Sequence, residues 1–458
     1  MSSVLATQPE PAPIVKAEQP PLRNTALLIS ACSILIFAPL AFGAVEPWAI
    51  FVLETSTLAL VMLWAYRQWT NQRLDICDSV LFRPMAAFFL LATVQWITGI
   101  SSYRHATYKY LLLYAAYGML AFVISQSVRR YSHFELLANT FTVFGGVLAA
   151  FAILQGLAPN GKLYWMFGLQ QGGFIYGPYV NHNHYAGLLE MLTPFPLVLA
   201  ATSTTSGSRR FGIAAVAALM AASVFLSGSR GGMIAIVVEA LLLGALLFRM
   251  RKEGEGGWQQ PAMLGGFIAL VVIFLVWMGG NELTKRLISI HSEAKEEITG
   301  GLRLTIDRDC LRMFLKRPLL GWGLGTFPFV YPQYRSFYTS FFVNQAHNDY
   351  LQLLVETGIA GFGIALWFLV MLFRQAASKM KNWSETSSGS LTVAALLGCI
   401  GILIHSFLDF NLHIPANAAW FFALCTIAAS GPLQESRRRK AVRRHNLVIE
   451  RISEAPVQ

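Results

Sequence analysis

Charged residues are scarce in this sequence. Aspartate and glutamate number 24 and lysine and arginine 35, so only 13% of the 458 residues are charged. A soluble globular protein carries about 25% charged residues. Hydrophobic residues make up 55% of the chain and gather in long runs, which excludes a soluble protein and indicates an integral membrane protein. Because these runs do not alternate with polar residues, a transmembrane β-barrel is also excluded.

Many of these runs approach the roughly 20 residues that a helix needs to cross a bilayer. We therefore predict an all-α, polytopic integral membrane protein with about 12 transmembrane helices. The predicted divisions are a disordered leader at 1–24, N-terminal transmembrane helices at 25–157, a membrane core at 158–430 with one large outer loop at 281–348, and a basic tail at 431–458. The predicted spans are 25–43, 48–66, 84–101, 108–127, 135–157, 184–203, 211–226, 231–248, 262–280, 352–373, 391–408 and 413–430.

Negative charge is the scarcer sign, and the net charge of +11 could indicate a nucleic-acid-binding protein. The basic residues, however, alternate from one predicted loop to the next, which is the positive-inside pattern of membrane proteins. The pattern predicts that both termini are cytoplasmic and that the basic excess meets anionic lipids, so no nucleic-acid partner is expected. The residues on the cytoplasmic side are Arg67, Arg73, Arg129, Arg130, Arg209, Arg210, Arg249, Arg251, Lys252, Arg374, Lys379 and Lys381, with Arg437, Arg438, Arg439, Lys440, Arg443 and Arg444 in the tail.

Cysteine is also rare. Of five cysteines, three fall in predicted spans, Cys77 is cytoplasmic and only Cys310 faces outward. No outward pair exists, so a structural disulfide is not expected. The Pro-rich leader does not resemble a cleavable signal peptide.

Two predicted outer loops are long enough to contribute to a site. Residues 158–183 are rich in glycine and aromatic residues, as in an interfacial or re-entrant segment. Within 281–348, the stretch 302–317 predicts an amphipathic helix whose arginines suit an anionic headgroup. A surface helix with merely solvated charges is an equal alternative. The predicted apolar stripe is Leu304, Cys310, Leu311 and Phe314, opposite Arg303, Asp307, Arg308, Arg312 and Lys316.

Arg230 is an outward-facing cation in the short loop LSGSRGG. An arginine at a helix end often extends to the lipid headgroups. On the outer side of this chain, however, lysine and arginine are otherwise rare, and flanking glycines allow a ligand to approach closely. The planar guanidinium suits bidentate binding of phosphate, so we predict a binding role for Arg230 and, with a weaker argument, for Arg303.

His347 and Asn348 precede a hydrophobic span that carries Gly358 and Gly361. His347 and Gly358 are eleven residues apart, about three turns at 3.6 residues per turn. We therefore expect them on nearly one helix face, with the polar pair at the membrane surface and the glycines admitting a neighbouring helix. An imidazole with an ordinary pKa near 6.5 suits proton transfer, although a histidine at a helix end is also often only a satisfied polar group.

His182 and His184 stand two residues apart in the segment NHNHYAG. Zinc sites use at least three protein ligands, and no carboxylate follows nearby. We therefore predict no metal site and no cofactor, and assign these histidines to anchoring the loop at the headgroup level.

Five motifs follow one another in order: SGSRGG at 227–232, GLR at 301–303, GWGLGTF at 321–327, AHNDYLQLLVETGIAG at 346–361 and HSFLDFNLHIPANA at 405–418. Together, over roughly 175–420, they resemble the membrane core of the O-antigen ligase and O-antigen polymerase superfamily. The functional arginines and histidine of that family map to Arg230, to Arg303 (less securely Arg308 or Arg312) and to His347.

The resemblance implies a bacterial inner-membrane glycosyltransferase whose large loop is periplasmic. It implies a glycan donor linked through pyrophosphate to undecaprenol, a glycan or lipid A-core acceptor, and metal-independent, inverting transfer to a sugar hydroxyl. The sequence does not separate a ligase of lipopolysaccharide biosynthesis from a polysaccharide polymerase.

The residues are consistent with this chemistry. Arginines stabilise the charge that grows on a pyrophosphate leaving group, and His347 is the candidate base for the acceptor hydroxyl. Asp409 and His413 either orient the acceptor or cap helices, and Asn348 and His184 are possible supporting residues. The alternative is a multi-pass transporter or flippase for lipid-linked glycan, for which Glu54, Glu190 and Glu239 are candidate intramembrane charges.

Overall fold

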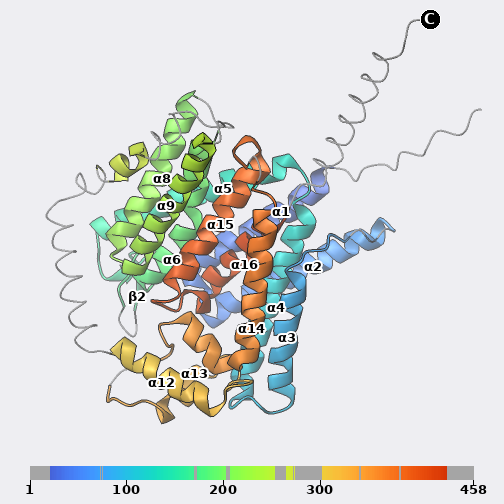
Figure 1. Ribbon diagram of the computed structural model, residues 1–458, viewed down its shortest axis with the longest axis vertical. Helices are drawn as coiled ribbons and strands as arrows, with labels where there is room; N and C mark the ends of the chain where they lie inside the picture. Colours follow the sequence, from blue (N-terminus) through green and yellow to red (C-terminus); the bar gives the residue numbers. More distant parts are fainter. Residues whose placement is uncertain are drawn as a thin grey trace, which may run out of the picture.

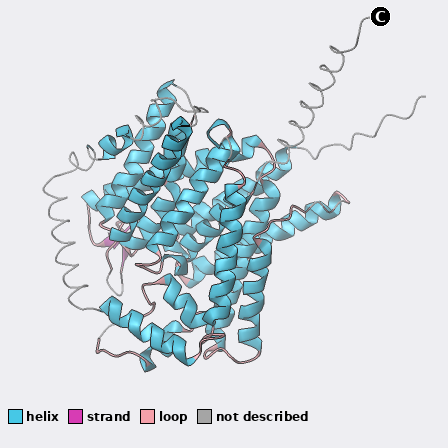
Figure 2. Cartoon of the chain, in the orientation of Figure 1, coloured by secondary structure: helices cyan, strands magenta, loops and turns pink. Residues whose placement is uncertain are grey.

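The computed structural model describes residues 21–72, 74, 76–169, 173–202, 207–252, 265–271, 273, 302–339, 342–380 and 383–430. This part of the chain is almost entirely helical (Figure 2). Its strands are the antiparallel pair β1 (Lys162–Leu163) and β2 (Phe167–Gly168). The leader to residue 20, most of the predicted span 262–280, the first part of the predicted outer loop and the tail from 431 lie outside the described residues.

The helices confirm an all-α, polytopic membrane protein. Each predicted span other than 262–280 falls on a helix, and the total of twelve stays a prediction. Among the described residues, seven helices are long and apolar enough to cross a bilayer: α2 (Pro47–Thr70), α4 (Arg104–Ser127), α5 (Tyr131–Leu157), α8 (Gly207–Ser227), α9 (Arg230–Lys252), α14 (Asp349–Ala377) and α15 (Ser387–His405). Three shorter apolar helices are α1 (Pro21–Leu40), α3 (Phe82–Ile97) and α16 (Pro415–Ala429).

The predicted span 184–203 is divided in two. Helix α6 (His182–Leu192) ends one residue before α7 (Pro194–Ala201) begins. Pro194 and Pro196 lack the backbone N–H that a continuous helix requires, so the helix breaks between them and Leu192. The remaining short elements are η1 (Phe42–Ala44), η3 (Trp383–Glu385) and η4 (Asn411–His413).

Helices α15 and α16 form the centre of the bundle. In Figure 1 they lie between α6, α8 and α9 on one side and α2, α3 and α4 on the other, and α15 contacts both α9 and α16, which in turn contacts α4. Small residues make this close packing possible: a side chain on Gly398 of α15 would collide with the backbone of Met191 in α6. The buried Trp420 stacks on Phe144, with ring centroids 5.8 Å apart, and donates its indole N–H to the Leu35 carbonyl at 2.8 Å.

Residues 302–339 form a small unit at one end of the bundle, seen beneath it in Figure 1. Helix α12 (Leu302–Lys316), α13 (Phe327–Val330) and η2 (Tyr331–Gln333) pack around a core of their own that includes Cys310, Phe327 and Val355. Arg317 donates to the Ile100 carbonyl at 2.9 Å and Ser102 N–H to the Trp322 carbonyl at 2.8 Å, so the unit is bound to the α3–α4 connection. We call this end of the bundle the loop end.

The predicted stripe of α12 was wrong in part. The helix itself is confirmed, and Cys310 and Phe314 face the small core, but Leu304 is 66% exposed and Leu311 is also exposed. Ile306 and Met313 are buried in their place. The helix has apolar residues on two faces, and periodicity alone does not tell which face meets the core.

The predicted single face from His347 to Gly358 was also wrong. His347 precedes the helix and has a positive φ of 54°, and α14 is interrupted at Gly358, where φ is 64°. The backbone of the small unit fills this interruption, with Ile359 N–H donating to the Pro318 carbonyl at 2.8 Å. Gly358 therefore admits the loop segment at Pro318–Leu319, not a neighbouring helix.

A buried carboxylate and a buried amide hold the glycine-rich turn at 321–327 in place. Glu356 of α14 accepts hydrogen bonds from Gly325 N at 2.7 Å and Phe327 N at 3.2 Å. Gln95 of α3 donates to the Leu320 and Glu356 carbonyls and accepts from Leu324 N. Gly325 has a positive φ of 75° and lies against Tyr110 of α4, so the turn is fixed to three helices at once.

Candidate active site

The connection between α15 and α16 is the centre of the loop end. Residues 405–409 form a tight turn in which Leu408 N and Asp409 N both donate to the His405 carbonyl, at 2.8 and 3.1 Å. The first residue of α14 joins it, because Asp349 N donates to the Ser406 carbonyl at 2.9 Å. We call this segment the 405–409 turn, and two of the predicted site residues, Asp409 and Arg303, belong to it or contact it.

His347 and Asp409 form a pair across this turn. The His347 Nδ1 lies 3.1 Å from Asp409 Oδ1, while Asn183 donates to Oδ2 at 2.7 Å and Phe410 N to Oδ1 at 2.9 Å. Burial by itself raises the pKa of Asp409, but the hydrogen bond and charge of His347, aided by Arg303, outweigh it and hold that pKa well below its ordinary value. Asp409 is therefore an ionised carboxylate around which donors converge.

The pair fixes which nitrogen of His347 is basic. A carboxylate only accepts, so Nδ1 carries the proton and the neutral ring presents Nε2 as its basic atom. The His347 side chain is 33% exposed, whereas Asp409 is buried, so a substrate can reach the imidazole. The Phe410 ring stands edge-on between the rings of His347 and His184, with centroids 4.8 and 4.7 Å away.

The backbone also holds His347 in place. Its φ of 54° is uncommon for a residue with a side chain, and such conformations concentrate at functional sites. The next residue, Asn348, is the N-cap of α14, and its side chain accepts from Tyr350 N and Leu351 N. Asn348 thus fixes the start of the helix and the orientation of the residue before it.

Arg303 reaches the same turn from α12. Its Nη1 donates to the Leu408 carbonyl at 2.9 Å, one residue from Asp409. Arg308 and Arg312 lie about 140° and 180° around the helix from Arg303 at 100° per residue, and Arg312 pairs with Asp309 at 3.2 Å. The structure therefore brings Arg303 to the site and turns the other two arginines away from it.

Asp307 is a residue of this site that the sequence reasoning passed over. It lies one turn after Arg303 on the same face of α12 and is half-buried. Burial raises the pKa of Asp307, and the neighbouring charges of Arg303 and His347 counteract that rise in part. The spacing of four residues from Arg303 was the signal in the sequence that could have found it.

Arg230 is the first residue of α9 and is exposed. A cation at a helix N-terminus is opposed by the helix dipole, so this arginine is not there to stabilise the helix. Ser229 caps the helix, its Oγ accepting from Gly232 N at 3.3 Å. The first-turn N–H groups and a guanidinium together form an arrangement suited to an anion such as phosphate.

The two histidines of the NHNH segment have separate environments. His182 Nδ1 donates to the Ser227 carbonyl at 2.9 Å, linking the start of α6 to the end of α8. His184 is buried against Phe410. Within the described ranges no group of three or more His, Cys, Asp or Glu residues is arranged to hold a metal ion.

A second imidazole–carboxylate pair mirrors the first. Asp349, two residues after His347, binds His413, four residues after Asp409, with Nδ1 to Oδ1 at 2.6 Å. Asp349 Oδ2 also accepts from Ser406 Oγ at 2.8 Å and Leu412 N at 3.0 Å. Burial alone lowers the pKa of His413, but the bond to Asp349 and nearby carboxylate charge outweigh it and raise that pKa above its ordinary value.

Part of this chain matches a known protein family. Residues 215–368 match the family model described as O-antigen ligase, a segment that contains Arg230, Arg303 and His347. This segment is an O-antigen ligase family domain. Asp409 and His413 lie beyond the matched segment, and no curated protein matches the chain.

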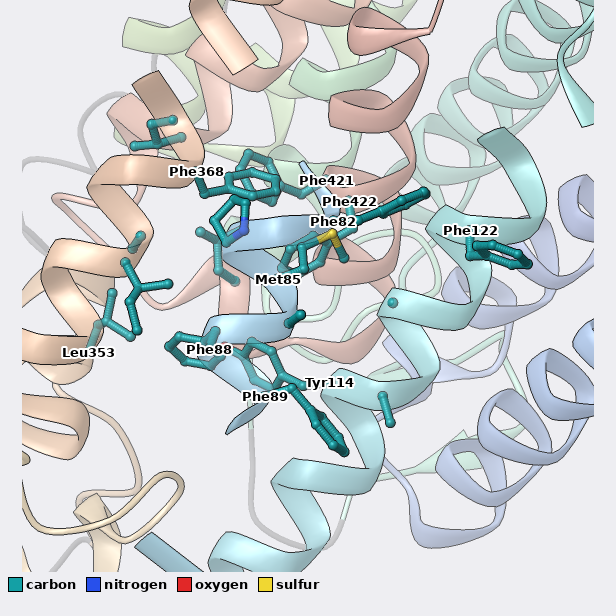
Figure 3. Close-up of a pocket in the computed structure, with 18 of the residues that line it drawn as sticks. Phe82, Met85, Phe88, Phe89, Tyr114, Phe122, Leu353, Phe368, Phe421 and Phe422 are labelled. Carbon is teal, nitrogen blue, oxygen red and sulfur yellow. The ribbon is translucent and has the colours of Figure 1, made fainter. Parts of the chain in front are cut away.

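An apolar cavity of about 750 Å³ (Figure 3) includes Asp349, the first residue of α14, in its lining. Side chains of α2, α3, α4, α14 and α16 line it, and Figure 3 shows phenylalanines from several helices around it. One part of the lining is polar, because Asp349 and the adjoining Tyr350 belong to it. The cavity therefore extends from the start of α14 along the apolar interior.

Proposed function

We propose that this protein is a bacterial inner-membrane glycosyltransferase that moves glycan from a lipid pyrophosphate donor to a sugar hydroxyl. The observation that carries the proposal is the His347–Asp409 pair, with Nδ1 held at 3.1 Å and the imidazole partly exposed. A histidine held in one tautomer by a buried carboxylate is the arrangement of a general base. The family match at 215–368 supports the reaction class, and the geometry of the site supports the roles.

In the proposed step the acceptor hydroxyl gives its proton to His347 Nε2. The hydroxyl oxygen forms a bond to the anomeric carbon of the donor sugar, and the bond from that carbon to the pyrophosphate oxygen breaks. The lipid pyrophosphate leaves with the electron pair. Asp409, kept ionised by its neighbours, stabilises the imidazolium that forms. Attack from the face opposite the leaving group inverts the anomeric configuration.

The leaving group accumulates negative charge during this step, and Arg303 and Arg230 are the proposed groups that stabilise it. Arg303 of α12 donates to the Leu408 carbonyl of the 405–409 turn, one residue before the Asp409 that pairs with the base. Arg230 adds a guanidinium to a helix N-terminus, so two kinds of anion-binding group act together there.

The apolar cavity supports a donor with a lipid chain. An undecaprenyl chain requires an apolar path that ends where its pyrophosphate meets the catalytic groups. The cavity is apolar and carries many aromatic side chains, and Asp349, two residues from the proposed base, belongs to its lining. We therefore place the lipid chain of an undecaprenyl-pyrophosphate donor against this cavity and its glycan at the loop end, which is periplasmic in this proposal.

The decisive experiment uses the purified protein in nanodiscs with undecaprenyl-pyrophosphate glycan as donor. Three acceptors are compared: lipid A-core, the free glycan, and a second molecule of lipid-linked glycan. Transfer to lipid A-core indicates a ligase, and extension of a lipid-linked chain indicates a polymerase. No transfer to any acceptor, with movement of intact donor between the leaflets of a liposome, would replace the proposal by a flippase.

The flippase alternative has one structural argument in its favour. Glu190 and Glu239 are buried within membrane helices, whereas Glu54 is only half-buried on α2. Intramembrane carboxyl groups are common in transporters. In this chain, however, the Glu190 carboxylate is paired with the imidazole of His405 at 2.9 Å.

A further inference from the structure

His405 links three helices just inside the loop end. Its Nδ1 lies 2.9 and 3.1 Å from the two carboxylate oxygens of Glu190 in α6, and its Nε2 lies 3.4 Å from the hydroxyl of Ser229. All three side chains are buried. A chain of polar contacts therefore runs from Glu190 through the last residue of α15 to the cap of α9.

The imidazole is also fitted closely to the backbone of α9. A Cβ on Gly231 would collide with the His405 ring, and a Cβ on Gly232 would lie 2.7 Å from Ala186 of α6 and 3.4 Å from Glu190. The two glycines thus let α9 approach both α6 and the imidazole at the turn that follows Arg230. Because neither position has room for a side chain, this turn of α9 packs directly against α6 and the His405 ring.

We propose that His405, oriented by Glu190, is a positioning residue that sets the first turn of α9 and with it the direction of Arg230. This inference rests on the proposed function, in which Arg230 binds the donor pyrophosphate. His405 is suited to the task because it begins the 405–409 turn, whose last residue orients the base His347. One short segment thereby sets the distance between the base and the anion-binding arginine.

A buried imidazole–carboxylate pair is a costly way merely to hold helices together, because apolar side chains of similar size do so at least as well. The pair adds a fixed orientation of the His405 ring. The carboxylate fixes the ring through Nδ1, and the ring fixes the Ser229 hydroxyl that caps α9. An exposed arginine on a long side chain binds an anion well only if its helix start is held still.

The test begins with hydrogen exchange, which does not depend on any substrate. In purified protein, His405→Asn should speed exchange of the Gly232 and Met233 amides by about fivefold, the size expected for loss of one capping interaction. His133→Asn is the matched control: His133 is equally buried but contacts Thr25 at the opposite end of the bundle. Unchanged exchange in His405→Asn, or equal changes in both variants, would overturn the proposal.

Donor kinetics form the second part. His405→Asn should raise the KM for the lipid pyrophosphate donor while the KM for the acceptor stays unchanged, and it should add nothing in an Arg230→Ala background. Equal effects of His405→Asn with and without Arg230 would contradict a role through Arg230. If exchange quickens but donor KM is unchanged in both His405→Asn and Arg230→Lys, positioning stands and the donor-binding role of Arg230 fails.

Two milder variants protect the test against misfolding. Ser229→Ala removes only the hydroxyl and should quicken exchange of the same two amides. Glu190→Gln keeps an oxygen that accepts from Nδ1, so it should retain most of the protection that Glu190→Leu loses. Equal protection in the Gln and Leu variants would show that Glu190 does not orient the ring.

Discussion

His347 combines at one residue the features that a general base requires. Its backbone is held in an uncommon conformation, its Nδ1 faces a buried carboxylate, and its ring remains partly exposed. The first two features have different physical origins: the capped start of α14 and the donors around Asp409. The expected consequences of changing single residues follow from these origins.

Replacing His347 by glutamine should lower the transfer rate by about 10²–10⁴-fold, the usual contribution of a positioned general base. Glutamine keeps hydrogen bonding but cannot take up the acceptor proton. The measurement is the rate of glycan transfer at saturating donor, with His105→Gln, an exposed histidine at the same end, as the control. Near-native transfer by His347→Gln would show that the histidine only orients the acceptor.

Replacing Arg230 by lysine should raise the KM for donor by roughly 10–100-fold, because loss of one charge-assisted hydrogen bond costs about 1.5–3 kcal/mol. Lysine keeps the charge but not the bidentate geometry. Arg308→Lys makes the same change on a side chain that α12 turns away from the site and should leave the KM unchanged. If lysine at position 230 performs as well as arginine, the residue only extends to the lipid headgroups.

At the scale of elements, the start of α14 and the α15–α16 connection are fastened by reciprocal pairs. Each segment contributes one histidine and one aspartate, so His347 binds Asp409 while Asp349 binds His413. The first pair is partly exposed and suited to catalysis, and the second is buried. The second pair therefore holds the two segments in register while the first remains accessible.

The raised pKa of His413 predicts how this fastening depends on pH. A group whose pKa is higher in the folded protein contributes stability that is complete below its unfolded pKa, near 6.5, and is lost as pH rises through the folded pKa. The difference in thermal midpoint between the native protein and His413→Asn should therefore shrink from pH 6 towards alkaline pH. It would be measured by fluorescence of detergent-purified protein. A difference that grows with pH would contradict the assignment of a protonated His413 bound to Asp349.

At the scale of the whole molecule, the distribution of basic residues predicts that the loop end is periplasmic and both termini are cytoplasmic. The test replaces Cys77 by serine, since the other four cysteines are buried, and adds one new cysteine at a time. Tyr338→Cys, at a side chain that is 92% exposed, should react with a membrane-impermeant thiol reagent in intact spheroplasts. Ser436→Cys should react only after lysis. The reverse pattern would place the donor and the site in opposite compartments and remove the proposed function.

The sequence by itself determined the class of this protein and indicated candidate residues for its site. Low charge in long apolar runs requires membrane helices because unpaired polar groups are costly in lipid. The order of short motifs around Arg230, Arg303 and His347 indicated the family that the match at 215–368 bears out. These features involve residues that are close together in the chain, so they can be recognised without knowledge of the tertiary structure.

Only the tertiary structure decided how those residues work together. Asp409 is 62 residues from His347 in the chain, and its partner could have been any polar group at the loop end. In the sequence, Asp307 is an ordinary helix charge and His405 a helix-end histidine. Packing brought Asp307 near His347 and placed His405 against Gly231. The interruption of α14 at Gly358 is occupied by the backbone of the loop at Pro318–Leu319, which is distant in the sequence. Contacts between distant segments leave no periodic trace in the sequence, because each depends on where several helices end at once.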